Sequence, residues 1–584
     1  MKFSTKPTYP RHLTAAIFLA SVSITFSVTL PAHAATSYLF YSTVALSGDR
    51  APGTEPPVVF KDFGPPSRSE PGLYVFQAVL DRSDVAAVRD LGIWRGHISN
   101  LQLVARENDA SPGVNNGLFD RFLPPRVPNE DITLFSGYAS ENNDPISGIW
   151  ENTNSETSAV VVEGTILNDD PPVVFRGNPL FKVNPWGHVA FYMEGTSSPS
   201  GKLTSIWTNR DGVLQPFPDE NTIFPDLPDW AISSQKLALD AFAWTGTERL
   251  VVAVNFEVFL LQPIGLYIES DDNTAIPIIP ISDSPIPEPG DLMGVVTLEG
   301  NVHGDIAFTA WQLPPDGSLA DRSPNTVWFV PQSADGTYQP EILATRGDQT
   351  PETDATFDRF SHLKLTSTGD VLFISTLEGE TINEYNNGVI WRAGENGLTI
   401  LAREGDHAPG TTQDVFFADF QTLQICDNSV VFNALLDGIT VTESNSQGLF
   451  ATDGQGNILL LARTGNTWDV NGDGSDIRII RSISPIAEYL PSLDDPNPHL
   501  SNIVFGLTFT DGTSGIFAVY IQDLIPGDVD RDGDVDQTDL AILLAYYGYS
   551  IWDPGFYPDA DLDEDNDIDQ SDLAILLAHF GESF

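Results

Sequence analysis

The amino-acid sequence predicts a mainly β protein: an eight-bladed β-propeller body followed by a small all-α domain at the C-terminal end. Two observations predict this architecture. A unit of three short strands recurs eight times within residues 35–520. A loop rich in aspartate, followed by an apolar helix, then occurs twice within residues 524–584. Self-similarity at a regular period is typical of propellers and other repeat architectures. A seven-bladed propeller is the near alternative.

Residues 1–34 have the pattern of a cleaved secretory signal peptide. Basic residues precede an apolar run over residues 15–30, and Ala32 and Ala34 provide a small-x-small cleavage site. Ser and Thr dilute the apolar run, which disfavours a membrane anchor. No later stretch has 18 consecutive apolar residues. We therefore expect a secreted protein, extracellular, periplasmic or associated with the cell surface, without a membrane span after cleavage.

The body, residues 35–520, repeats one pattern of strands. In each unit a first strand ends in Phe or an aliphatic residue, a second reads Gly-Ile-Trp or a close variant, and a third is rich in Leu, Val and Ala. The spacing of the units averages about 61 residues between Phe76 and Phe505, which suits a four-stranded blade with long loops. Short β-branched runs bounded by Gly, Pro and Asn argue against helical repeats. The same strand pattern is also compatible with a β-solenoid or with paired β-sandwiches.

The two ends of the body complement each other. The last unit lacks its own outer strand, whereas residues 42–53 carry the Gly-Asp-x-Ala-Pro-Gly run that recurs intact within residues 401–410. An N-terminal strand that completes the last blade would close the ring and leave no open sheet edge. The units Asn-x-x-Gly-x-x-Ala-Phe at residues 184–191 and 301–308 resemble a tandem repeat of secreted bacterial proteins. That resemblance implies no particular activity.

Residues 524–584 contain one motif twice. Each copy is a twelve-residue loop with carboxylates at positions 1, 3, 5, 9 and 12, followed by Leu-Ala-Ile-Leu-Leu-Ala. These are the positions from which EF-hand loops bind calcium, together with the backbone carbonyl of position 7. Gly533 and Asn566 occupy position 6, where the chain must turn sharply. Val535 and Ile568 occupy position 8, and we expect them to face inward and pair the two loops. An acidic disordered tail is the alternative.

No entering helix can precede either loop, because Pro526 and Pro558 stand where such a helix would end. Two loop-then-helix units without entering helices resemble the type I dockerin domain. The resemblance implies two calcium ions. Their ligands would be Asp528, Asp530, Asp532, Asp534, Asp536 and Asp539 in the first loop, and Asp561, Asp563, Asp565, Asp567, Asp569 and Asp572 in the second.

The same resemblance implies that loop positions 10 and 11 recognise a cohesin-like protein partner. These positions are Gln537 and Thr538 in the first copy, and Gln570 and Ser571 in the second. Gln stands at position 10 in both copies, where a hydroxyl residue is more usual in the family, so the identity of the partner is open. The near-identity of the two copies would permit docking in two orientations related by pseudo-symmetry.

Composition excludes several classes of partner. The chain carries 81 acidic and 28 basic residues, a net charge of −53, and residues 521–584 alone carry 15 Asp and two Glu against one Arg. This charge excludes a general affinity for nucleic acid. It also indicates dependence on calcium or on salt that screens self-repulsion. Cys426 is the single cysteine, so no intramolecular disulfide can form, and its strand context predicts burial rather than nucleophilic chemistry.

The body contains no singular catalytic constellation, and we assign no catalytic residue. The signatures of zinc proteases, serine hydrolases and phosphate-binding loops are absent from the sequence. Carboxylates such as Glu107 and Glu404 recur at equivalent repeat positions, which indicates a role in turns. Residues 469–474 copy the first six positions of a calcium loop, but Ile480 replaces the closing carboxylate at position 12. That loop is either a weak ion site or a plain Asx/Gly turn.

Three functional hypotheses follow. In the leading one, the chain is a secreted calcium-binding protein whose tail docks to a cohesin-like partner while the body acts as a binding or structural module. In the alternative, the body is a glycoside hydrolase of polysaccharide catabolism, or an accessory component with a carbohydrate ligand, because dockerin-like tails often accompany such enzymes. In the third, the tail is a calcium-stabilised cap that packs against its own body.

Overall fold

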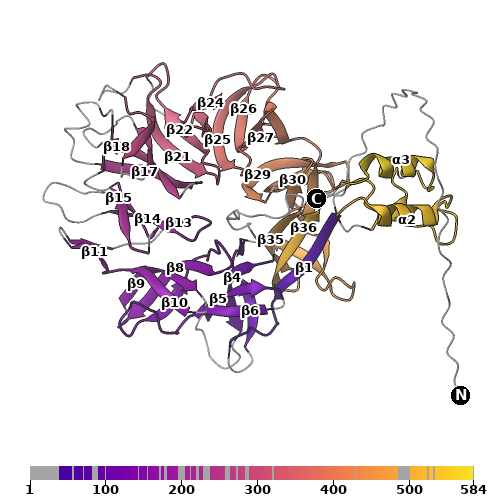
Figure 1. The fold of residues 1–584 in the computed structure, drawn as a ribbon, viewed down its shortest axis with the longest axis horizontal. Coiled ribbons are helices and arrows are strands. Elements are labelled where there is room, and N and C mark those ends of the chain that lie inside the picture. The colour runs from indigo at the N-terminus through magenta and orange to yellow at the C-terminus, as the bar shows by residue number, and fades with distance from the viewer. Residues whose placement is uncertain are drawn as a thin grey trace, which may run out of the picture.

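The computed structural model consists of a ring of β-sheets and a pair of short helices beside it (Figure 1). The predicted signal peptide, residues 1–34, lies outside the described residues. These comprise residues 38–582 apart from gaps at 55–57, 70–71, 82–89, 99, 143, 154–155, 170–171, 176–180, 195–203, 211, 219–221, 226, 228–236, 247, 257–263, 271–273, 283–287, 318–320, 428, 485–499, 523–524, 531–532 and 564.

Within this described part, eight sheets of at least four antiparallel strands form the blades of the propeller. The first strands of the blades are β2 (Val59–Phe63), β7 (Leu118–Phe122), β13 (Phe181–Val183), β17 (Leu237–Thr245), β21 (Leu292–Gly300), β25 (Thr356–Leu365), β29 (Val415–Cys426) and β34 (Ile477–Ile483). The second strands are β4 (Tyr74–Asp81), β8 (Ile132–Glu141), β14 (Val189–Glu194), β18 (Arg249–Phe256), β22 (Ile306–Gln312), β26 (Val371–Glu378), β30 (Ser429–Gly438) and β35 (Leu500–Phe509). The eight-bladed prediction is confirmed.

The remaining strands complete the blades. The third strands are β5 (Leu91–His97), β9 (Asp144–Thr153), β15 (Thr204–Thr208), β19 (Gly265–Glu269), β23 (Thr326–Val330), β27 (Gly388–Gly394), β31 (Gln447–Thr452) and β36 (Ser514–Gln522). The fourth strands are β6 (Asn100–Arg106), β10 (Glu156–Val162), β16 (Gln215–Phe217), β20 (Ala275–Ile279), β24 (Glu341–Thr345), β28 (Gly397–Arg403), β32 (Ile458–Arg463) and β1 (Tyr38–Leu46). Short strands β3 (Ser67–Arg68) and β33 (Thr467–Asp469) pair with β4 and β34, and β11 (Ile166–Asp169) pairs with β12 (Pro172–Val174).

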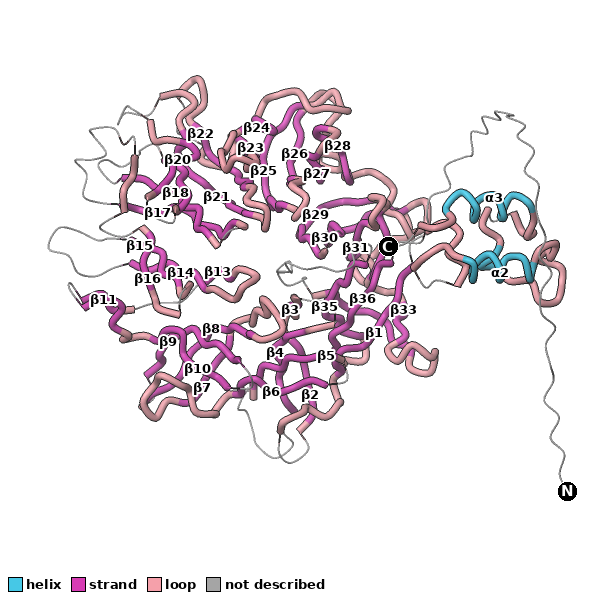
Figure 2. The backbone as a smooth tube through the Cα atoms, viewed as in Figure 1, coloured by secondary structure: helices cyan, strands magenta, loops and turns pink. Residues whose placement is uncertain are grey.

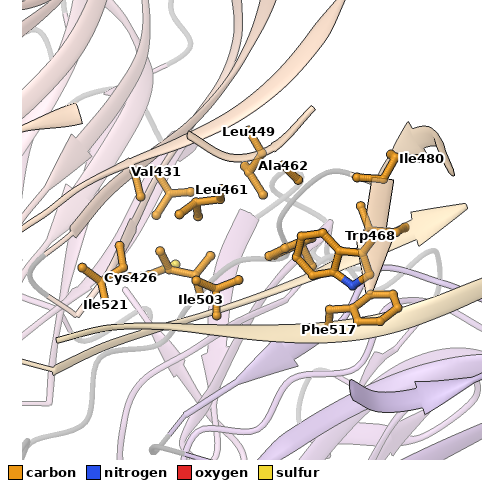
Figure 3. Packing of buried hydrophobic residues seen from close by; sticks show 14 of the residues in the cluster. Cys426, Val431, Leu449, Leu461, Ala462, Trp468, Ile480, Ile503, Phe517 and Ile521 are labelled. Carbon is orange, nitrogen blue, oxygen red and sulfur yellow. The ribbon is translucent and has the colours of Figure 1, made fainter. Parts of the chain in front are cut away.

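The core of the body consists of apolar clusters between neighbouring blades. Each blade contributes one face to the cluster on either side of it, because side chains alternate between the two faces of a strand. One cluster joins the last blade to the first, through Val44, Phe60 and Ile516 among others. The ring is therefore closed by packing. Figure 3 shows the neighbouring cluster between the seventh and eighth blades, in which Cys426 lies among apolar side chains such as Val431 and Ile503.

The N-terminal strand closes the ring, as the sequence predicted. β1 pairs antiparallel with β36, from Tyr38 opposite Gln522 to Leu46 opposite Gly515, and forms the outer edge of the last blade. A buried ion pair joins Arg68 of the first blade to Asp427 of the seventh. The same carboxylate accepts a hydrogen bond from the backbone N–H of Asn502 in the eighth blade. Strand pairing and a polar network thus hold the two ends of the propeller body together.

The first strand of each blade is the element that the sequence pattern missed. The predicted units correspond to the second, third and fourth strands, so each blade gains one strand ahead of the predicted three. Several first strands share a Phe-x-x-Phe sequence interrupted by a β-bulge, which places both rings on one face. The paired rings are Phe60 with Phe63, Phe119 with Phe122, Phe357 with Phe360, and Phe417 with Phe420.

In the described residues, helices are confined to the C-terminal segment, as Figure 2 shows. They are α2 (Gln537–Tyr546), the 3-10 turn η1 (Pro558–Ala560) and α3 (Gln570–His579). A small apolar cluster beneath them includes Val535, Leu543, Ile568 and Leu576. Within the same part of the chain, none of the helices has the length and apolar character needed to cross a membrane.

Candidate functional site

Each acidic loop of the tail folds into a tight turn that leads directly into a helix. Gly533 and Asn566, at position 6, have φ angles of +96° and +75°, the left-handed conformation that this position requires. Their backbone N–H groups each donate a 3.0 Å hydrogen bond to the position-1 carboxylate, Asp528 and Asp561 respectively. The two loops therefore share one backbone path, which the sequence predicted from the residue types at position 6.

The carboxylates at position 12 hold both loops together. Asp539 and Asp572 are fully buried, and each accepts three backbone N–H bonds from its own loop. The donors to Asp539 are Val529, Asp530 and Asp536, at 2.6 to 3.1 Å, and the donors to Asp572 are Leu562, Asp563 and Asp569, at 2.5 to 3.2 Å. The position-9 residues Asp536 and Asp569 cap the helices that follow in capping boxes.

The loops bring carboxylate oxygens within reach of a common point. Ligand atoms that lie within 4.8 Å of one another are offered by Asp528, Asp530 and Asp539, by Asp534, Asp536 and Asp539, and by Asp561, Asp563 and Asp565. Asp532 lies outside the described residues. Asp567, Asp569 and Asp572 belong to the second loop but not to its cluster. An all-oxygen donor set of this kind suits Ca²⁺ and disfavours the softer metals.

The second loop shows the electrostatic signature expected of a cation site. Oδ1 of Asp561 is buried and accepts no hydrogen bond from a described residue, which is costly for an ionised oxygen. Burial, followed by the charges of neighbouring carboxylates, raises the pKa of Asp561 and of Asp563. A divalent cation would relieve both the burial cost and the repulsion. The residues present fit calcium.

The expectation for loop position 8 is confirmed at the level of side chains, since Val535 and Ile568 lie in one apolar cluster. The position-8 side chains Val535 and Ile568 are fully buried, as predicted, but their backbones do not pair with each other. Val535 instead exchanges hydrogen bonds with Gly581 and Glu582, after the second helix. Ile568 exchanges them with residues 548–549, after the first helix. Each loop is thus hydrogen-bonded to the residues that follow the helix of the other loop–helix unit.

The predicted partner-recognition residues lie on exposed helix starts. Gln537 and Thr538 begin α2, Gln570 and Ser571 begin α3, and all four are exposed. The sequence reasoning missed Leu544 and Leu577, each 53% exposed, which stand seven residues after the two glutamines on the same helix face. The sequence did contain a signal for these two residues, because a Leu recurs seven residues after position 10 in both copies. Each helix thus presents the same polar and apolar face.

The repeated carboxylates of the body are structural acceptors. Oε2 of Glu404 accepts a 2.6 Å hydrogen bond from the backbone N–H of Gly388, and Oε2 of Glu107 accepts a 3.0 Å bond from Leu91. In both cases the fourth strand of a blade is tied to the start of the third. Burial raises the pKa of the Cys426 thiol to about 12, which disfavours the thiolate that a nucleophile requires.

The loop at residues 469–474 closes on itself. Oδ2 of Asp469 accepts a 2.7 Å hydrogen bond from the backbone N–H of Gly474, and Oδ1 of Asp473 accepts a 2.9 Å bond from Ser475. These are turn contacts between β33 and β34, and they match the Asx/Gly turn that the sequence allowed.

Comparison with family models decides where this fold belongs. The model of the Family of unknown function (DUF7453) matches residues 33–176 and 69–522, which covers most of the chain. The chain belongs to the DUF7453 family. The model of the Dockerin type I domain matches residues 526–580, so the dockerin resemblance of the tail is confirmed. Dockerin domains bind calcium and imply a cohesin-type partner, and the DUF7453 body is a β-propeller.

Solved structures similar to the DUF7453 chain include two propellers and a prolyl oligopeptidase. The β-propeller domain of the Trilobed protease from Pyrococcus furiosus is 12% identical, covers 70% of this chain and 99% of its own, and has a TM-score of 0.36. Prolyl oligopeptidase B from Galerina marginata is 12% identical, covers 87% of this chain and 62% of its own, and has a TM-score of 0.37. The Dos1 propeller is 9% identical, covers 82% of this chain and 93% of its own, and has a TM-score of 0.35. These scores carry no weight for function. No curated protein matches the chain.

Proposed function

We propose that this DUF7453 protein is an exported, calcium-dependent docking protein whose propeller binds a ligand, and that it works without catalysis. The observation that carries the proposal is the duplicated acidic loop, with a buried position-12 carboxylate and a nearly identical exposed helix face in each copy. The signal-peptide pattern of residues 1–34 supports export. Residues 35–520 would form the propeller domain and residues 524–584 the dockerin domain.

Two calcium ions would bind, one in each loop. The oxygens would come from Asp528, Asp530, Asp532, Asp534, Asp536 and Asp539, and from Asp561, Asp563, Asp565, Asp567, Asp569 and Asp572, with Asp534 and Asp567 contributing backbone carbonyls. Like charges gathered in each loop oppose its folding, and the cation offsets that repulsion. Folding of the tail should therefore be coupled to metal binding.

Titration calorimetry of calcium into the chelator-treated full chain tests this arrangement. We expect two ions per chain, and one ion for Asp530→Ala or for Asp563→Ala, because each removes a position-3 ligand from one loop. Asp559→Ala, in η1 outside both loops, is the matched control and should retain two. No binding at millimolar calcium, or an equal loss in the control, would contradict the proposal.

Docking would use the exposed face that starts at Gln537 and Thr538 in one helix, or at Gln570 and Ser571 in the other. Since the two faces are equivalent, we expect Leu544→Glu or Leu577→Glu alone to leave calcium-dependent binding to immobilised cohesin modules within about threefold. The double variant should lose at least about 100-fold, or more than ~2.7 kcal/mol.

Two outcomes of the docking experiment distinguish other arrangements. The control Ile439→Glu changes a body residue that is 94% exposed, and it should bind like the unmodified chain. A large loss from one single variant would contradict the two equivalent faces. If the tail instead packs against its own body, the double variant would lower the unfolding temperature of the body, and binding to cohesin modules would be absent throughout.

A further inference from the structure

The middle of the ring contains a cavity of about 140 Å³. Its walls come from the ends of β13, β17, β21, β25 and β29 and from the turns that follow them, and Figure 1 shows β13 and β29 reaching toward this central region. An engineered cavity of ~150 Å³ holds one benzene molecule. The cavity therefore has room for a ligand unit of about one six-membered ring.

The cavity gathers cations in a protein that has few of them. The whole chain contains seven lysines, and three of these, Lys61, Lys182 and Lys364, lie in the described residues. Two of the three, Lys182 and Lys364, line the cavity, together with Arg126. The lining carboxylates are Glu299 and Asp427. Asp427 pairs with the buried Arg68, so the local charge is positive although the net charge of the chain is −53.

The two lysines converge on consecutive residues of β21. Nζ of Lys182, from β13, donates a 3.1 Å hydrogen bond to the carbonyl of Leu298, and Nζ of Lys364, from β25, lies 3.0 Å from Oε1 of Glu299. An ammonium group carries three N–H donors, so the bond to Leu298 leaves Lys182 able to donate to a ligand. We call Lys182 and Lys364 the clamp, because both line the cavity and two ammonium groups beside one cavity favour an anion there.

Aromatic side chains contact Lys182, and two of them, Trp186 and Trp244, line the cavity. Trp244 donates its indole N–H to the carbonyl of Lys182 at 3.4 Å, and the Lys182 ammonium lies 5.7 Å from the centre of the Phe242 ring. Trp186, in the turn after β13, is half-buried and lines the cavity. A flat indole beside polar donors can stack on the apolar face of a sugar ring, because tryptophan offers a large rigid surface.

We propose that this cavity binds one carboxylate-bearing sugar residue, such as the uronate end of an oligosaccharide. Lys182 and Lys364 contact the carboxylate, and Trp186 stacks on the ring. A long polyanion is disfavoured, because the net charge of −53 on the chain as a whole repels it. The proposal deepens the ligand-binding role given to the propeller above and rests on it.

Calorimetry of the calcium-loaded full chain in low salt tests the proposal with a matched pair of probes. D-galacturonate carries the carboxylate, and D-galactose has the same ring with a neutral hydroxymethyl group. We expect galacturonate to bind at one site per chain and galactose to bind at least about tenfold more weakly, since the carboxylate contributes a charge-assisted contact. No galacturonate binding at millimolar concentration, or equal binding of the two sugars, would overturn the proposal.

Lysine variants distinguish a specific contribution of the clamp to binding from a general effect of removing positive charge. Lys182→Met and Lys364→Met should each weaken galacturonate binding by about tenfold or more, whereas Lys182→Arg should retain most of it. The control Lys61→Met removes a lysine of β2 outside the cavity and should change nothing. A loss in Lys61→Met equal to that in Lys182→Met would contradict a specific site. Unchanged unfolding temperatures would show that the variants are folded.

Sulfate and Trp186→Ala distinguish a sugar site from a site for any small anion. For a sugar site, sulfate competes weakly and Trp186→Ala weakens galacturonate at least about fivefold. If sulfate binds as tightly as galacturonate and Trp186→Ala has no effect, the cavity is an inorganic-anion site and the proposal is wrong. Docking to cohesin modules is measured on the same samples, so failure of the cavity site and failure of the docking function can be told apart.

Discussion

At the scale of single residues, buried carboxylates at equivalent positions of the repeat hold neighbouring strands together. Glu404 is 6% exposed and Glu107 is 8% exposed, and each accepts a backbone N–H from the third strand of its own blade. Burial is the largest cause of the raised pKa of Glu404, ahead of the hydrogen bond from Gly388, which lowers it. The carboxylate therefore provides an acceptor at the cost of burying a charge.

Glu404→Gln and Glu404→Leu separate these two effects. Gln keeps an acceptor for Gly388 without the charge, so we expect stability at pH 7 equal to or above that of the unmodified chain. Leu leaves the Gly388 N–H without its acceptor and should cost about 1–3 kcal/mol. Urea denaturation of the body measures both, and a Gln variant as destabilised as the Leu variant would contradict this account.

The pH dependence of the Gln variant has a defined sign. Because the folded-state pKa of Glu404 is raised above its unfolded value, the unmodified chain loses stability as pH rises from about 4.3 through the folded-state pKa. The Gln variant has no such group. Its stability relative to the unmodified chain should therefore increase over that window and level off above it.

At the scale of elements, β1 decides whether the ring is closed. It is the fourth strand of the last blade although it comes first in the chain, and Val44 and Ala45 of β1 are buried in the cluster between the last and first blades. A strand that covers an edge and also completes a core should affect the whole body, because loss of it exposes both.

Val44→Asp tests the role of β1 by placing a carboxylate in that cluster. Val44 is 5% exposed, so we expect a loss of about 3 kcal/mol or more in the unfolding free energy of the body. Phe40→Asp, on the same strand at a position that is 43% exposed, should cost less than about 1 kcal/mol. A body transition unmoved by Val44→Asp would show that β1 frays without opening the ring.

At the scale of the whole molecule, charge is the dominant constraint. A net charge of −53 opposes compaction through self-repulsion, and salt screens that repulsion. The two acidic loops concentrate the effect in the tail, where the carboxylates lie close together. Stability should therefore depend on ionic strength in the body and on calcium in the tail.

Thermal unfolding in sodium chloride tests the charge argument. With calcium held constant, raising the salt from about 0.01 M to 0.3 M should raise the unfolding temperature of the body by about 2–5 °C. The gain should level off above that concentration, since the Debye length is by then only a few ångströms. A linear rise that continues to molar salt would indicate salting-out of apolar surface instead.

Much of this protein could be predicted from sequence because its main signals are local and repeated. The acidic loops depend on residues within twelve positions of one another, and Gly533 and Asn566 take the left-handed conformation that their positions predicted. The second and third strands of each blade pair with each other without a register shift, so their pattern recurs clearly. The first strands carry bulges and mixed exposure, as β25 and β29 show, and that irregularity hid them.

By itself, the sequence determined the blade repeat, the closing strand and the two acidic loops, since each depends on spacing along the chain. Only the tertiary structure decided which distant side chains meet. Lys182 and Lys364 are far apart in sequence, yet both reach consecutive residues of β21. Arg68 of the first blade forms an ion pair with Asp427 of the seventh, although the two residues are far apart in sequence. Such contacts leave no periodic trace in the sequence, because they arise from the circular arrangement of blades rather than from any one of them.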